Sequence, residues 1–487
     1  MIGQGTVTAS APFDYAARQK IVAATLTVIF LTTLLSLFVD ALAIKLVAGA
    51  AYLVFVAVAM VDGIRRDYYF MAATIGLSVL ILLLRADPWP IIGRAILLAS
   101  FFSSFLLALN ILRDAAKTSL AVRRCGNYVI AQPPGRRYAV LTFAAHLFAV
   151  ILNYGVVNLL GTMVKRSNTM DAAGGDLRRF KIREKRMMLA VLRGQCTMVG
   201  WSPLSILIAI VVALIPGLTW GGVAPAGALY SVLFLAVGWA MDRIEWRPRA
   251  GASIAVLPQA AAGDFAPAVL PMAVILVCII GLVVGANLLL GISMVGAIML
   301  MLPLFALAWI AVQFRHLGPR LMPAMLLRRI KRMPMREFAG ARSETLILSS
   351  AAYIGAALSA VVPEDAVANV MTSLHLPWLA VAIILAVAIP ILGQFGINSL
   401  VMLTLIGGAL HHLPVDGLPS VLLAVALLGG ASLSIASSPY GTPVVLIGGL
   451  TGETPEQVGR AWNGKFTVVA LIVLCLYLTA LWFVWPR

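Results

Sequence analysis

The sequence predicts an all-α polytopic membrane protein with about 11 transmembrane helices plus two oppositely oriented re-entrant hairpins in an inverted repeat. Hydrophobic residues make up 61% of the 487 residues, charged residues 11%, and the mean hydropathy is +0.99. A soluble domain carries roughly 25% charged residues, so this class is excluded. Apolar runs of about 20 residues, the length that crosses a bilayer, recur along the chain. Two of these runs do not fit a simple alternation of crossings.

The apolar runs begin close to the N-terminus and continue to the C-terminus. They fall at 21–39, 42–61, 68–84, 91–112, 139–164, 187–215, 222–241, 268–288, 291–314, 343–361, 378–413, 418–450 and 465–485. The first run is followed by Ala41-Leu42-Ala43, which resembles a signal-peptide cleavage site. Its length is typical of a retained helix, so we expect it to remain, with cleavage as the alternative. The four cysteines have no metal-ligand spacing and predict no disulfide.

The net charge of +17 indicates the topology. Lys and Arg collect in cytoplasmic loops, and no nucleic-acid-binding motif accompanies them, so we expect no nucleic-acid partner. Basic clusters flank the 139–164 run on both sides, at 113–137 and 165–186, so that run should enter and leave the membrane from the cytoplasm. The loops around 378–413 contain no Lys or Arg, so the second hairpin should enter from outside. This topology predicts a multi-pass plasma-membrane protein, in the cell inner membrane if bacterial, with a cytoplasmic N-terminus.

The two hairpins and the segments after them form a repeat. The hairpins have polar tips, tip 1 (Asn153–Asn158) and tip 2 (Gly393–Ser399). Each is followed by a long apolar run with a polar, Pro-containing interruption, break 1 (Gly200–Ser205) and break 2 (Ser437–Pro443). Tips and breaks recur at separations of about 240 residues, with the halves entering from opposite faces, which is typical of inverted-repeat transporters.

Tips and breaks are the predicted binding site. An interrupted helix is tolerated in a membrane only where it is buried in protein or lines a wet cavity, and proline removes a backbone donor there. Freed carbonyls coordinate a cation, while half-helix N-termini attract an anion. The alternative for a lone proline is a kink, and for a lone asparagine an interhelical hydrogen bond. The predicted substrate- and ion-binding residues are Asn153, Gly155, Asn158, Ser202, Pro203, Ser205, Gln394, Gly396, Asn398, Ser399, Ser437, Ser438, Pro439, Gly441, Thr442 and Pro443.

No carboxylate lies in mid-membrane near these residues, which favours an anionic substrate over a cationic one. His146 is the candidate proton carrier, and a hydrogen-bonded core histidine is its alternative. We therefore favour Na⁺ over H⁺ as the coupling ion and expect no cofactor and no bound metal, including at His411-His412 with Asp416 nearby. An intramembrane enzyme is the alternative class, but neither HExxH nor GxSxG occurs.

The Asn-bearing tips, each followed by a helix broken at Ser, Thr, Pro and Gly, resemble the ion transporter superfamily, in particular the divalent anion/sodium symporters. The closest stretch is 433–443, Leu-Ser-Ile-Ala-Ser-Ser-Pro-Tyr-Gly-Thr-Pro, followed by Ile447-Gly448-Gly449. The resemblance covers about residues 136–485. It implies a dimerising scaffold and a mobile transport domain that carries a small organic anion by an elevator motion, as a secondary active transporter. An inorganic oxyanion substrate and cation/proton antiport are alternatives on the same fold.

The expected domain organisation follows from the topology and this resemblance. The transport halves are 136–220, with the inner hairpin and first broken helix, and 378–450, with the outer hairpin and second broken helix. Residues 315–342 form a cytoplasmic linker, interpreted either as an amphipathic helix on the inner surface or as an ordinary solvated loop. The remaining segments are the cytoplasmic N-terminus 1–20, scaffold helices 21–135 and 221–314, a scaffold helix and outer loop 343–377, and the terminal loop and helix 451–487.

Overall fold

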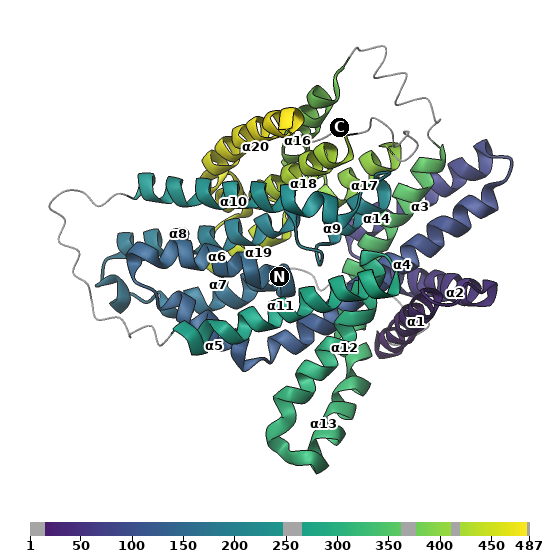
Figure 1. Ribbon diagram of the computed structural model, residues 1–487, viewed down its shortest axis with the longest axis horizontal. Helices are drawn as coiled ribbons and strands as arrows, with labels where there is room; N and C mark the ends of the chain where they lie inside the picture. Colours follow the sequence, from purple (N-terminus) through teal and green to yellow (C-terminus); the bar gives the residue numbers. More distant parts are fainter. Residues whose placement is uncertain (1–14, 247–264, 362–375, 411–418, 485–487) are drawn as a thin grey trace, which may run out of the picture. The chain divides into compact units, whose positions relative to one another are not determined.

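A computed structural model of the chain describes residues 15–246, 265–361, 376–410 and 419–484, and every regular element in these ranges is helical (Figure 1). Ten helical runs among them are long and apolar enough to cross a membrane, judged by length and composition. One of the ten, Met294–Val361, contains two of the predicted spans. The predicted all-α polytopic fold is confirmed. Outside the described ranges lie the leader before residue 15, Arg247 and Arg249, the outer loop 362–375, and His411, His412 and Asp416.

The chain divides into two compact units. Unit 1 comprises Met1–Asp114 and Leu302–Ala357. Its helices are α1 (Tyr15–Ser36), α2 (Leu42–Val61), α3 (Arg65–Leu84), α4 (Pro88–Lys117), the end of α12 (Met294–Phe314), η3 (Arg315–Leu317), α13 (Gly318–Met333), η4 (Pro334–Phe338), η5 (Ala339–Ala341) and α14 (Arg342–Val361). The residues interpreted as a linker are therefore largely helical.

Ion pairs join the helix ends of unit 1. Arg18 of α1 donates two hydrogen bonds to the carboxylate of Asp62, at 3.0 Å and 2.7 Å, and Arg342 at the start of α14 approaches the same carboxylate to 3.2 Å. The hydrogen bonds from Arg18 hold the pKa of Asp62 below its usual value, and both arginine charges act in the same direction. One carboxylate thus ties together α1, the end of α2 and the start of α14.

Unit 2 comprises Ala115–Met301 and Leu358–Arg487 and contains both predicted hairpins and both breaks. Its helices are α5 (Leu120–Ile130), α6 (Pro134–Leu152), α7 (Gly155–Ser167), η1 (Asp171–Ala173), α8 (Leu177–Thr197), η2 (Met198–Gly200), α9 (Ile206–Leu214), α10 (Trp220–Glu245), α11 (Phe265–Leu290), α16 (Trp378–Gly393), α17 (Ser399–Leu410), α18 (Ser420–Ser437), α19 (Thr442–Thr451), η6 (Gln457–Trp462) and α20 (Gly464–Val484). Helix α5 was not predicted, because it is amphipathic and carries Arg123 and Arg124 rather than an apolar run.

The two halves of unit 2 are built alike. In each, two helices are joined at a tip and followed by a helix interrupted at a break: α6, α7, α8 and α9 in the first half, and α16, α17, α18 and α19 in the second. Helices α16 and α17 have only 16 and 12 residues, and 12 residues rise only about 18 Å. They are therefore shorter than a bilayer crossing, although their membrane re-entry stays a prediction.

Close contacts show how the halves pack. In the first half, α6 runs parallel to α8, because Tyr138 lies next to Arg193 while His146 lies next to Thr197. Between halves the packing is reciprocal: α7 contacts α19, and α9 contacts α17. Helices α16, α18 and α20 lie together (Figure 1). Their buried side chains, mostly small and aliphatic, belong to one hydrophobic core. This exchange of partners is what a two-fold relation between the halves requires.

Candidate functional site

Tip 1 is a tight two-residue turn between α6 and α7. Asn153 has φ 50° and ψ −127°, and Tyr154 has φ −62° and ψ −19°, which together form a type II′ turn. Asn153 is the one non-glycine residue with positive φ among the described residues, and asparagine tolerates positive φ better than most residues. Asn158 lies exposed on the first turn of α7. Within the described residues, the side-chain amides of Asn153 and Asn158 make no hydrogen bond, so both are open to a ligand.

Break 1 keeps a turn of backbone hydrogen bonds before the helix stops. The N–H of Ser202 donates to Met198 O at 3.1 Å, and the N–H of Ser205 donates to Ser202 O at 3.0 Å. Pro203 between them has no N–H, so the helix cannot continue, and α9 begins at Ile206. Ser202, Pro203 and Ser205 are all buried. The break is therefore an interior feature of unit 2.

A histidine of α6 is hydrogen-bonded to break 1 and to the residues just before it. Thr197 donates its hydroxyl hydrogen to Gly194 O at 2.9 Å, so it must accept the 2.8 Å hydrogen bond that it shares with His146 Nδ1. Trp201 Nε1–H donates to His146 Nε2 at 2.9 Å, and the two rings stack. These partners assign a neutral imidazole with its proton on Nδ1. Trp220 donates to Trp201 O at 2.9 Å and fixes the same loop from α10.

Two buried polar side chains beside break 1 lack partners within the described residues. Gln195 is 0% exposed, and neither its amide oxygen nor its amide nitrogen is hydrogen-bonded. Ser202 is also 0% exposed, and its hydroxyl is likewise unpaired. An unpaired buried polar group costs about 1–3 kcal/mol, so a native fold retains one chiefly where a water, an ion or a ligand completes it. These atoms are the strongest sign of a ligand at break 1.

Arg193 connects α8 to break 2. It is 4% exposed, its Nε donates to Asn463 Oδ1 at 2.8 Å, and its Nη1 donates to Tyr138 Oη at 2.9 Å. Its guanidinium also lies over the Phe466 ring, 4.5 Å from the centroid. Asn463 in turn donates to Ala436 O at 2.9 Å, one residue before break 2. Among the described residues, no carboxylate forms an ion pair with Arg193, so a buried positive charge is held by neutral groups.

Tip 2 is hydrogen-bonded directly to break 2. Gln394 donates to Ser437 Oγ at 3.1 Å, and Ser438 donates its hydroxyl to Gly393 O at 2.6 Å. Arg460 of η6 donates to both the side-chain and backbone oxygens of Gln394, at 3.1 Å and 2.9 Å. Tip 2, break 2 and η6 therefore form one connected polar cluster.

The fold is that of a solved membrane transporter. The crystal structure of the YdaH transporter from Alcanivorax borkumensis, described as having an unusual topology, matches this chain with a TM-score of 0.54. The match covers 86% of this chain and 99% of that chain, at 14% sequence identity. No family model matches the sequence, and no curated protein matches it. The similarity establishes a shared fold and carries no residue roles.

The other predicted site residues fall into three groups by exposure. Pro439, Pro443 and Ser399 are buried, whereas Gly396, Asn398 and Thr442 are exposed and Gly155 and Gly441 lie between these extremes. Asn398 accepts a hydrogen bond from the N–H of Leu400 at 2.9 Å, which caps the start of α17. Gly396 has φ +90°, which a side chain would strain. Tip 2 thus lies against break 2, whereas break 1 is joined to α6 through His146, and among the described residues no hydrogen bond joins tip 1 to tip 2.

Several polar residues that lie at the breaks in the structure were not among the predicted site residues. Arg193, Gln195 and Thr197 lie next to break 1 in sequence, and Asn463 reaches break 2 from 27 residues away. The signal was present for the first three, since Arg-Gly-Gln-Cys-Thr interrupts an otherwise apolar run, and intramembrane polar residues are functional candidates. For Asn463 no local pattern exists, because its role depends on how α20 packs.

Proposed function

We propose that the protein is a secondary active transporter that moves a small organic anion across the membrane, coupled to Na⁺ or H⁺, by an elevator-type alternating-access mechanism. The observation that carries this proposal is the pairing of a polar tip with a broken helix in each half of unit 2, with reciprocal packing between the halves. The shared fold with a solved transporter supports transport over an intramembrane enzyme. The resemblance to divalent anion/sodium symporters supplies the proposed substrate class.

The charges around the breaks support an anionic substrate. The sequence contains no Asp or Glu from 187 to 241, which includes all of break 1. Helix α9 begins immediately after break 1 and α19 begins within break 2, and the N-terminus of each presents backbone N–H groups and a positive dipole end. A cation would find no carboxylate at break 1, whereas an anion gains from these donors. An inorganic oxyanion satisfies the same donors and is the second candidate substrate.

The hydrogen bonds of His146 support Na⁺ over H⁺ as the coupling ion. Its two ring nitrogens are occupied as one donor and one acceptor, and protonating Nε2 would set its new N–H against the Trp201 N–H. We therefore propose Na⁺ coupling, with His146 as a structural residue. We expect His146→Gln to leave the shape of the pH profile of anion uptake between pH 5 and 8 unchanged, even where the rate falls. A profile that becomes flat in the variant would instead make His146 the proton carrier.

The unpaired groups beside break 1 allow stability to be separated from function. We expect Ser202→Ala and Gln195→Met to keep or raise the thermal unfolding midpoint, because each removes a buried polar group that has no protein partner. The same variants should lower anion uptake at least about tenfold if these atoms bind the substrate or the ion. The matched control is Ser231→Ala, a buried serine already bonded to Thr197 O and Gly227 O, which should lose stability. Unchanged uptake in both variants would remove break 1 from the site.

A binding screen tests the proposed substrate class and ion. Purified protein in detergent is heated with mono-, di- and tricarboxylates, sulfate and phosphate, each with NaCl and with choline chloride. We expect a dicarboxylate-type anion to raise the unfolding midpoint, and Na⁺ to enhance the effect. Stabilisation by sulfate or phosphate alone would favour the oxyanion alternative. Stabilisation by cations alone would contradict the proposal.

We also propose that the protein is a homodimer in the plasma membrane, with residues from the scaffold segments forming the dimer contact. This rests on the resemblance to the divalent anion/sodium symporters. Light scattering of the purified protein, corrected for bound detergent, should give twice the chain mass of 51.7 kDa. A value equal to one chain would contradict it.

A further inference from the structure

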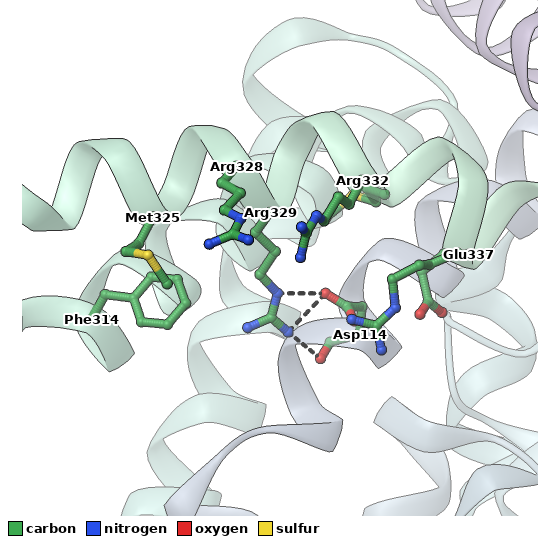
Figure 2. Close-up of a pocket in the computed structure, with 9 residues that line it drawn as sticks. Asp114, Phe314, Met325, Arg328, Arg329, Arg332 and Glu337 are labelled. Atoms are coloured by element: carbon green, nitrogen blue, oxygen red, sulfur yellow. Dashed lines mark hydrogen bonds and ion pairs between the residues drawn. The ribbon is translucent and has the colours of Figure 1, made fainter.

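A cavity of about 190 Å³ lies in unit 1, between α13 and the ends of α4 and α12 (Figure 2). Phe314, Met325 and Met333 supply apolar lining, and the rest of the wall is charged. Figure 2 shows the side chains of Arg328, Arg329 and Arg332 leaving α13 toward Asp114 of α4. The cavity lies in a different unit from tips 1 and 2 and breaks 1 and 2, so it is not part of the proposed substrate site.

Four guanidinium groups surround this cavity, against two carboxylates, Asp114 and Glu337. Arg329 is already paired within the protein. It donates to the Asp114 carboxylate and to Asp114 O, both at 2.8 Å, and its side chain is 15% exposed. The remaining three, Arg328, Arg332 and Arg336, make no hydrogen bond or ion pair within the part of the chain that the structure describes. With Arg329 paired to Asp114, three exposed guanidinium groups line the cavity against one carboxylate, Glu337, so the cavity keeps a net positive charge that attracts an anion.

Helix α13 is amphipathic. Arg328 and Arg332 are four residues apart on one side, and Arg336 follows four residues later on η4. Leu327 and Ile330 lie on the other side of α13 and are exposed. A helix with a basic side and an exposed apolar side is typical of the membrane interface, where the apolar side meets acyl chains and the basic side meets headgroups.

We propose that the arginine cavity, defined by Arg328, Arg332 and Arg336, binds the phosphate of an anionic phospholipid. Guanidinium groups bind phosphate oxygens in bidentate fashion, and three of them converge here without other partners. The apolar wall formed by Phe314 and Met325 accommodates the glycerol and the first acyl carbons, which a free phosphate would leave uncovered. Basic pockets at the cytoplasmic side of membrane helices are recurrent sites for such headgroups. The occupant is therefore a lipid rather than soluble phosphate.

The test uses the full-length protein in detergent with three probes: phosphatidylglycerol, zwitterionic phosphatidylcholine and inorganic phosphate. Native mass spectrometry counts the lipid retained, and the shift of the unfolding midpoint gives an apparent affinity. The test variant is R328Q/R332Q/R336Q. The matched control is R315Q/R320Q/K331Q, which removes three charges from the same exposed segment but none from the cavity wall.

We expect the wild type and the control to retain phosphatidylglycerol with affinities within about twofold, and R328Q/R332Q/R336Q to bind it at least about tenfold more weakly. R328K/R332K/R336K keeps the three positive charges but loses the bidentate geometry of the guanidinium groups. It should therefore fold normally and bind the lipid with intermediate affinity. Equal loss in both glutamine variants would show general surface attraction and overturn the proposal. Equal retention of phosphatidylcholine, or full competition by inorganic phosphate, would also overturn it.

Discussion

Gly227→Ala is expected to prevent the protein from reaching its native fold. Gly227 of α10 lies directly against the backbone of break 1, and an alanine Cβ there would lie 1.8 Å from Gly200 O. Both groups are backbone-fixed, so α10 and break 1 must separate, which also disturbs Tyr230 and Trp220. We expect a loss of about 3 kcal/mol or more in the free energy of unfolding. Thermal unfolding and the yield of monodisperse protein measure it.

The control for this prediction is Gly221→Ala on the same helix. An alanine Cβ at Gly221 meets nothing within 4 Å, so the substitution should be neutral or slightly stabilising. Similar unfolding midpoints for the two variants would mean that α10 does not pack on break 1 as described. A reduced midpoint for Gly221→Ala alone would contradict the placement of α10.

Arg193→Gln is the second substitution with a large expected effect. It removes the donors that Asn463 Oδ1 and Tyr138 Oη accept, and it empties the space over the Phe466 ring. Hydrogen bonds to a charged group contribute about 1.5–3 kcal/mol each, so we expect a loss of about 3 kcal/mol or more. Because Asn463 also holds Ala436 O, break 2 should become looser and anion affinity should fall as well.

Arg178→Gln is the matched control, since Arg178 lies exposed at the start of the same helix, α8. We expect it to leave both the unfolding midpoint and anion affinity unchanged, because an exposed arginine contributes little. Arg193→Lys separates charge from geometry: a lysine keeps the charge but reaches two acceptors less well. Full stability in Arg193→Gln would show that the guanidinium does not brace break 2.

Much of the fold could be predicted from the sequence, because two signals can be read from short segments. These are the length of each apolar run and the side of the membrane on which the Lys and Arg residues of each loop are expected. The runs at 42–61 and 465–485 correspond to α2 and α20 within a residue. The breaks were found because Pro203 and Pro439 lack the N–H that a continuing helix needs. The two helical hairpins, α6 with α7 and α16 with α17, were predicted from the charges of their flanking loops. Their membrane re-entry stays a prediction.

The contacts that define the candidate site could not be predicted in the same way. The hydrogen bond from Arg193 to Asn463 joins residues 270 positions apart, and that from Trp201 to His146 joins residues 55 apart. Such pairs depend on which helix faces meet, and nothing in local periodicity fixes that. Likewise, the close approach of α10 to break 1 depends on the missing side chain at Gly227. A single glycine within an apolar run does not by itself indicate such a contact.

Uptake by the purified protein in sealed liposomes tests whether it carries an anion in exchange for the energy of an ion gradient. Wild-type liposomes loaded with potassium buffer are placed in labelled dicarboxylate with an inward Na⁺ gradient, an inward H⁺ gradient, or neither. We expect concentrative uptake that depends on the Na⁺ gradient and falls at least about tenfold in Ser202→Ala, while that variant keeps its unfolding midpoint. Absence of uptake of any carboxylate or oxyanion under either gradient, by protein that is folded and correctly inserted, would contradict it.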